Sequence, residues 1–162
     1  MSTTKNIANH LRHIHSGVNW TWSNYKDQLA DITWQQATTK IYNLNTIATL
    51  VQHIHYYMPA IITVLEGGKL EASDKASFNL PPITSAEEWS NLQTRLFNDA
   101  EKLASLIEDL PEENLWKIFS EEKYGSYYRN LSGLIEHHHY HLGQIVVIKK
   151  ILTEQEALKK VK

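Results

Sequence analysis

The sequence from Leu131 to Ile148, LSGLIEHHHYHLGQIVVI, decides the fold that we expect for this chain. Apolar residues recur along it at steps of three and four, the spacing of one face of an amphipathic helix. Four of the chain's nine histidines lie in the same stretch, so the expected core helix also carries a cluster of polar rings. The apolar positions are Leu131, Leu134, Ile135, Leu142, Ile145, Ile148 and Leu152.

The first of three further helical stretches runs from a capping residue at Thr3 or Thr4 to Leu29. Its apolar pattern is interrupted at Ser16 and Gly17 and then resumes. One helix with a break and two shorter helices are both compatible with this pattern.

The second and third stretches have clearer ends. The second begins near Asn45, a good capping residue, and ends at the glycine pair 67–68. Pro59 falls inside its apolar pattern, which predicts a kink or one lost hydrogen bond rather than an end. The third opens with a capping box at Ser85, where the fourth residue is a glutamate, and closes at Pro111.

Four amphipathic helices without a strand pattern predict an all-α fold, a four-helix bundle that forms one domain over residues 1–162. The stretch from Lys69 to Pro82 has no helical period and is the longest expected loop. A loop of this length favours an up-down-down-up order of helices over a series of tight hairpins. The charged tail that follows Thr153 is expected to fray.

Composition narrows the classes of function. The net charge is −2 and there is no basic block, which argues against nucleic-acid binding. The chain has no cysteine, so any metal site must use histidine, carboxylate and water. No apolar run approaches the length of a membrane span, and the first residues, MSTTKNIANHLRHIH, do not resemble a signal peptide. We therefore expect a cytoplasmic protein with no membrane partner.

The histidines of the last helix have the spacing of metal ligands. His137 and His141 are four residues apart, which places their Cβ atoms about 5–6 Å apart on one face of a helix. On a helical wheel His141 points inward, and His137 lies at the edge of the apolar face. His138 also lies within this face, so the wheel leaves both His137/His141 and His138/His141 open as the pair. Gln144 lies near the His137 edge and can orient a histidine or border the core.

The helix around Ile54 offers two more histidines, His53 and His55, on opposite edges of its apolar face. The pattern does not choose between them. A third histidine would complete a site with open positions for water or substrate, as catalytic sites require. Ligation by histidine alone suits zinc, nickel or iron. The alternative is that these histidines are half-buried side chains whose hydrogen bonds are satisfied by their neighbours.

Two segments resemble the DinB-like superfamily of metal-binding four-helix bundles. They are HIHYY, residues 53–57, and IEHHHYHLGQI, residues 135–145. Members carry a histidine followed by an apolar residue on the second helix, and two histidines separated by three residues that lead into a Gly-Gln pair. The resemblance is specific between residues 133 and 145, and extends elsewhere only to the order of helices. It implies the metal ligands His53, His137 and His141, although His55 and His138 depart from the usual pattern.

The resemblance also implies a function. Members are up-down-down-up bundles, often homodimers, with a divalent metal at one end of the helices. Some resemble S-transferases or isomerases that use a low-molecular-weight thiol such as bacillithiol or mycothiol. We therefore expect a metal-dependent enzyme, a transferase or a hydrolase. A non-catalytic metal-binding or stress-related bundle and a purely structural dimer are the alternatives.

The sequence identifies neither a catalytic residue nor a thiol site. Tyr56, Tyr57 and Tyr140 are candidate proton donors because they lie near the histidines in the sequence, and core aromatic residues are the alternative reading.

Overall fold

The computed structural model describes residues 2–160 and is all-helical over this range, as the sequence predicts. Its four long helices are α1 (Thr3–Ser16), α4 (Ile47–Leu65), α6 (Ala86–Asp109) and α7 (Tyr127–Lys160). The shorter elements are α2 (Tyr25–Leu29), α3 (Trp34–Thr38), α5 (Asp74–Ser77) and the 3-10 turns η1 (Glu112–Trp116) and η2 (Glu122–Tyr124).

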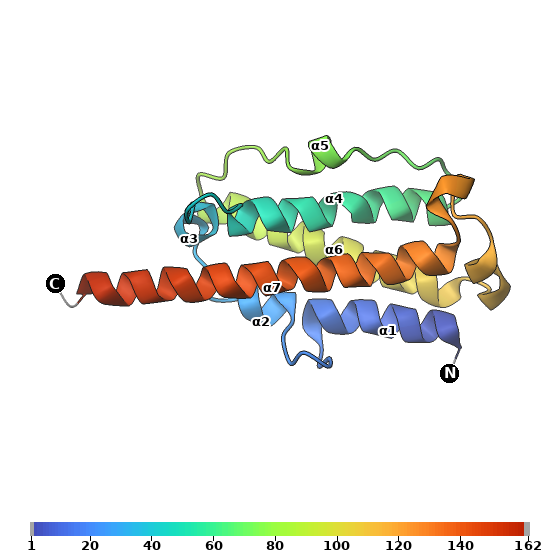
Figure 1. Ribbon diagram of the computed structural model, residues 1–162, viewed down its shortest axis with the longest axis horizontal. Helices are drawn as coiled ribbons and strands as arrows, with labels where there is room; N and C mark the ends of the chain where they lie inside the picture. Colours follow the sequence, from blue (N-terminus) through green and yellow to red (C-terminus); the bar gives the residue numbers. More distant parts are fainter. Residues whose placement is uncertain (1, 161–162) are drawn as a thin grey trace.

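The long helices lie side by side and close a ring (Figure 1). Around this ring α1 contacts α6, α6 contacts α4, α4 contacts α7, and α7 returns to α1. In Figure 1, α1 and α7 run toward one end of the molecule, and α4 and α6 run toward the other. The connection between α4 and α6, which includes α5, runs back along the outside of α4. Helix α7 therefore has two long neighbours, α4 on one side and α1 on the other.

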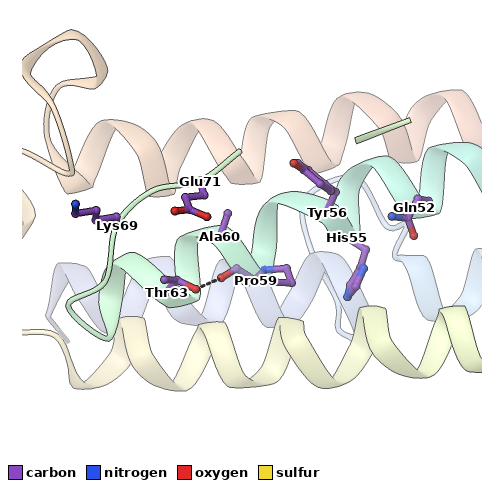
Figure 2. A pocket seen from close by; sticks show the side chains of 8 residues that line it. All are labelled: Gln52, His55, Tyr56, Pro59, Ala60, Thr63, Lys69 and Glu71. Atoms are coloured by element: carbon purple, nitrogen blue, oxygen red, sulfur yellow. Dashed lines mark hydrogen bonds between the residues drawn. The ribbon is translucent and has the colours of Figure 1, made fainter. Parts of the chain in front are cut away.

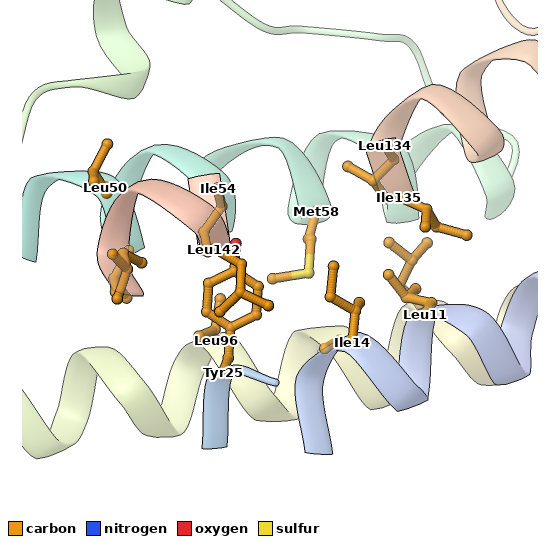
Figure 3. Packing of buried hydrophobic residues seen from close by; sticks show 14 of the residues in the cluster. Leu11, Ile14, Tyr25, Leu50, Ile54, Met58, Leu96, Leu134, Ile135 and Leu142 are labelled. Atoms are coloured by element: carbon orange, nitrogen blue, oxygen red, sulfur yellow. The ribbon is translucent and has the colours of Figure 1, made fainter. Parts of the chain in front are cut away.

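The core fills the space between these helices (Figure 3). Leu11 of α1, Met58 of α4, Leu96 of α6 and Leu142 of α7 all point into it and are at most 2% exposed. Burying each such side chain stabilises the fold by about 1.5–3 kcal/mol. This packing fixes which face of α7 meets α4 and which face meets α1.

The helix starts lie close to their predicted positions. Ser2, not Thr3 or Thr4, caps α1, and its Oγ accepts a hydrogen bond from the backbone of Lys5. Thr46, one residue after Asn45, caps α4. The predicted capping box at the start of α6 is present, with both of its reciprocal hydrogen bonds formed.

The structure confirms the prediction for Pro59 and decides between the two alternatives for the first helical stretch. Pro59 lies inside α4, and the helix continues beyond it to Leu65. The α1 segment ends at Ser16, and α2 begins separately at Tyr25, so the alternative of two shorter helices is correct.

The segment 69–82 is irregular over most of its length, as predicted, and contains one helical turn, α5, capped by Ser73. The prediction for the tail is wrong. The tail does not fray within the described residues, because α7 continues to Lys160. Leu152 is buried near the start of this tail, and Gln36 donates a hydrogen bond of 2.9 Å to Glu156. These contacts tie α7 to the bundle at Leu152 and Glu156, and the end of the helix projects beyond α3 (Figure 1). Within residues 2–160, none of the helices combines the length and apolar character that crossing a membrane requires.

Candidate metal centre

Three imidazole rings meet between α4 and α7. His53 comes from α4, and His137 and His141 come from α7. The Nε2 atom of His137 lies 3.0 Å from Nε2 of His53 and 2.9 Å from Nε2 of His141. All three ligand atoms lie within 4.8 Å of one another. The structure thus brings together the three residues that the resemblance implies, and we call them the histidine triad.

The outer nitrogen of His53 is held by a chain of hydrogen bonds. Its Nδ1 atom lies 2.7 Å from Oγ of Ser77, and this hydroxyl donates to the backbone oxygen of Asp74 at 2.5 Å. Because the single hydroxyl proton of Ser77 is used in that second bond, Oγ accepts from His53. The proton of the His53 ring is therefore on Nδ1, and Nε2 presents a lone pair to the triad.

The outer nitrogen of His141 is held in the same way. Its Nδ1 atom lies 2.7 Å from Oε1 of Gln144, an oxygen that only accepts. Nδ1 therefore carries the proton, and Nε2 of His141 is free. Such outer hydrogen bonds fix the tautomer and orientation of histidine ligands in metal sites.

The two lone pairs leave the triad incompletely satisfied without a cation. A proton on Nε2 of His137 can serve only one of its two neighbours at a time. A divalent ion would accept all three lone pairs. Two nitrogens bound at about 2.0–2.1 Å to a tetrahedral ion lie roughly 3.3 Å apart, and the observed 3.0 and 2.9 Å come close to this value. The donor set suits zinc, nickel or iron, and the two separations that involve His137 are close to those of bound ligands.

Burial keeps the triad neutral. Burial, together with the neighbouring His141 and His53, lowers the pKa of His137 to about 4. Burial also lowers the pKa of His53 and of His141, against a smaller opposing effect of the Gln144 hydrogen bond on His141. At neutral pH all three rings are therefore uncharged, and a neutral imidazole is the form that binds a metal ion.

Aromatic rings cover the triad. Phe78 stacks on His53 with ring centroids 4.0 Å apart and an angle of 15° between the planes. Tyr57 meets both His53 and His137 edge to face, with centroids 5.4 Å from each. Together these rings shield one side of the triad from water.

The tyrosines considered as proton donors have different surroundings. The hydroxyl of Tyr57 donates to Oδ1 of Asp74 at 2.9 Å, and burial raises its pKa. The Tyr56 hydroxyl accepts from the backbone of Ser73 at 3.1 Å, which ties it to the loop. Tyr140 packs edge-on against His141, with centroids 4.9 Å apart, and is 64% exposed. Only Tyr57 and Tyr140 therefore contact the triad.

The two alternative histidines face other parts of the bundle. His55 lies 2.8 Å from Oδ2 of Asp99 in α6. His138 is fully buried, its Nδ1 atom lies 2.8 Å from the backbone oxygen of Leu134, and its ring lies against His15 of α1. The ambiguity of the helical wheel is thus resolved in favour of His137.

A separate cavity of about 620 Å³ lies on another face of α4 (Figure 2). None of its eight lining residues belongs to the triad, and Figure 2 shows His55 pointing toward α6 rather than into the space under the loop. This cavity is therefore not the opening of the metal centre. Its lining residues are Gln52, His55, Tyr56, Pro59, Ala60, Thr63, Lys69 and Glu71.

Sequence reasoning missed three residues at the site: Asp74, Ser77 and Phe78. They lie on or beside α5, in a segment without helical period, 21 or more positions after His53. A Ser-Asp-rich stretch between two periodic segments was the only signal, and it is common to many surface loops.

Comparisons of the chain with protein-family models, with curated proteins and with solved structures found no match. The description of the site therefore depends on its own geometry: three converging imidazoles, two of them held at the outer nitrogen by a side chain.

Proposed function

We propose that this chain is a DinB-like metal-binding protein with an up-down-down-up four-helix bundle. In this proposal His53, His137 and His141 hold one divalent ion, zinc or nickel before iron. One observation carries the proposal: three neutral Nε2 atoms converge while Ser77 and Gln144 hold two of the rings from outside. The resemblance in sequence adds the expectation of a homodimer.

We further propose that the site is catalytic. Three protein ligands leave positions for water or substrate, unlike the closed sites that stabilise folds. A bound ion there would act as a Lewis acid and lower the pKa of a water or thiol. The chain's own residues orient the imidazoles through Ser77 and Gln144, and Phe78 and Tyr57 keep water from one side.

The reaction class that we favour is transfer or rearrangement at a low-molecular-weight thiol, as in S-transferases and isomerases. Because the chain contains no cysteine, the sulfur must belong to a separate substrate molecule. The aromatic rings of Phe78, Tyr57 and Tyr140 beside the triad are compatible with an apolar acceptor for that sulfur.

Metal content tests the first half of the proposal. We expect about one ion per chain in the purified protein by elemental mass spectrometry. The His137→Ala/His141→Ala double variant is expected to lose it while keeping its helical circular dichroism. His139→Ala, on the same helix, is the matched control and is expected to keep the ion. A wild-type protein that stays metal-free after incubation with zinc and nickel would overturn the proposal.

Thiol transfer tests the second half. The metal-loaded protein is mixed with bacillithiol or mycothiol and the neutral electrophile 1-chloro-2,4-dinitrobenzene. We expect product formation that a chelator abolishes and that the double variant lacks. Stoichiometric metal without turnover of either thiol would instead support the non-catalytic metal-binding alternative.

A further inference from the structure

Two glycines in the interior of α7, Gly133 and Gly143, flank the two triad histidines of that helix. Glycine inside a helix costs about 0.5–1 kcal/mol relative to alanine. Neither residue has a left-handed backbone, and a Cβ atom added at either would meet nothing within 4 Å. Neither backbone geometry nor close packing therefore requires glycine at these positions. What each glycine provides is open space beside the triad.

The space beside Gly143 is a cavity of about 500 Å³ between α7 and the start of α4, which we call the Gly143 cavity. Its lining is apolar, with side-chain amides as the main polar groups, and none of its nine residues is charged. A charged ligand would be desolvated there without a partner, which is costly. The lining residues are Asn43, Leu44, Asn45, Leu50, Tyr140, Gly143, Gln144, Val147 and Ile148.

Gln144 links the Gly143 cavity to the triad. Its Oε1 atom accepts the hydrogen bond of His141, so its NH₂ group remains as the donor side of the same amide. Gln144 also lines the cavity, so one side chain belongs to the cavity and to the surroundings of the triad. On α4, Leu50 lines the cavity one turn before His53. On α4 the cavity therefore lies one helical turn from His53. On α7 it is lined by Gln144, which bonds to His141.

The backbone at the edge of the Gly143 cavity is strained. Tyr42, which precedes Asn43, has a φ of 49°. A bulky residue in this region costs about 1–3 kcal/mol, and the Tyr42 side chain is 79% exposed, so burial does not offset the strain. The strained residue directs segment 43–45 along the cavity. Strain of this kind is concentrated at ligand-binding sites.

We infer that the Gly143 cavity binds an uncharged, apolar small molecule that carries a hydrogen-bond acceptor, with the Gln144 amide as donor. The identification of this molecule as the acceptor substrate of the triad depends on the proposed function. The binding itself depends only on the lining side chains and requires no metal ion.

The test uses prodan, a neutral naphthalene with a carbonyl acceptor whose fluorescence shifts to the blue in apolar sites. We expect saturable binding with a blue shift in the wild-type protein. Gly143→Leu fills the cavity and is expected to weaken binding by roughly tenfold or more, which corresponds to about 1.4 kcal/mol. Gly133→Leu is the matched control, because it adds the same side chain to the same helix outside the Gly143 cavity, and it is expected to leave binding within about twofold.

Val147→Trp provides a second way to fill the cavity. Val147 is 54% exposed, so the larger side chain need not disturb the core, and this variant covers the case in which Gly143→Leu does not fold. Circular dichroism checks the fold of each variant.

Three results would overturn the inference. The first is that prodan does not bind saturably to the wild-type protein. The second is that prodan binds equally well to the wild type and to folded Gly143→Leu or Val147→Trp. The third is that Gly133→Leu weakens prodan binding as much as Gly143→Leu does. The same titration on chelator-treated protein, with metal measured in parallel, separates this inference from the proposed function. Prodan binding to metal-free protein supports ligand binding in the Gly143 cavity, even if the triad binds no metal. Metal binding without prodan binding rejects the inference about the cavity and leaves the proposed metal site standing.

Discussion

Helix α7 carries two buried histidine clusters that differ in their outer hydrogen bonds. In the triad, side chains from other positions, Ser77 and Gln144, hold Nδ1, and the Nε2 atoms converge. In the pair formed by His15 and His138, each Nδ1 bonds to the backbone oxygen four residues earlier in its own helix. The Nε2 atoms of that pair are buried without a hydrogen-bond partner.

The comparison shows how the triad differs from a pair of core histidines. The rings of both clusters are neutral because burial lowers their pKa, so the pKa does not separate them. His15 and His138 are buried, and in the triad His137 is only half-buried. A ring bonded to its own helix is fixed as a core side chain, and its buried Nε2 atom costs about 1–3 kcal/mol. A ring whose Nδ1 atom is held by another side chain can point its Nε2 atom away from its own helix. In the triad, the Nε2 atoms of three rings meet in this way.

The largest expected effect is loss of a ligand from the triad. His53→Ala removes one of three nitrogens, and we expect zinc affinity to fall by roughly two to three orders of magnitude. This follows from about 10–16 kcal/mol shared among four ligands in structural zinc sites. Isothermal titration with zinc measures the change, with His55→Ala as the control on the same helix. Similar losses in both variants would mean that the triad is not the metal centre.

The next effect concerns pH and the His15–His138 pair. Burial lowers the pKa of His15 to about 4, whereas the unfolded chain titrates near 6.5. Protons therefore bind the unfolded chain more tightly, and His15 contributes to stability above pH 6.5 but loses that contribution as pH falls toward 4. A difference of this size amounts to about 3 kcal/mol. We expect His15→Leu to reduce the loss of stability between pH 6.5 and 4 by about this amount.

Urea denaturation of chelator-treated protein at several pH values measures this contribution. The exposed His10, exchanged for alanine, serves as the control for the removal of another histidine from α1. Because the triad titrates alike in all three proteins, only the difference between them reports on His15. A His15→Leu profile parallel to that of the wild type would contradict the assignment of His15 as a core histidine.

A smaller effect is expected at the outer partners of the triad. Ser77→Ala and Gln144→Leu each leave one imidazole without its orienting hydrogen bond. Loss of such a partner typically costs about 10–100-fold in metal affinity. Competition with a chromophoric chelator measures it, and Ser73→Ala is the control for Ser77 because it lies on the same segment but caps α5 instead. Unchanged affinity in both variants would show that the outer hydrogen bonds do not orient the ligands.

The sequence predicted much of the helical framework because that framework depends on local patterns. The capping box at Ser85 and the apolar stripes sufficed for the long helices, within one or two residues at their starts. The tail after Thr153 was mispredicted because its order comes from contacts with a distant segment, among them the hydrogen bond between Gln36 and Glu156. Ser77 was missed for the same reason: its role exists only once the loop returns along α4.

The choice between His137 and His138 shows the limit of the helical wheel. Helix α7 contacts both α4 and α1, so its buried face is wider than one stripe. Neighbouring residues on a helix differ by about 100° in direction. His137 can therefore face α4 while His138 faces α1, and both lie on the buried side. The resemblance implied His137, which the structure groups with His53 and His141, whereas the wheel measures burial rather than partners.

The smallest effect is expected at His138, next to a triad ligand in sequence. His138→Leu removes the unpaired Nε2 atom and the bond to Leu134, two changes of opposite sign and of about 1 kcal/mol each. We expect zinc affinity within about twofold of the wild type and a free energy of unfolding within about 1 kcal/mol of it. Titration with zinc and urea denaturation measure the two quantities. If His138→Leu lost zinc as His53→Ala is expected to, the distinction between ligand and core histidines on α7 would fail. An unchanged affinity would show that residues adjacent in sequence act separately because each faces a different helix.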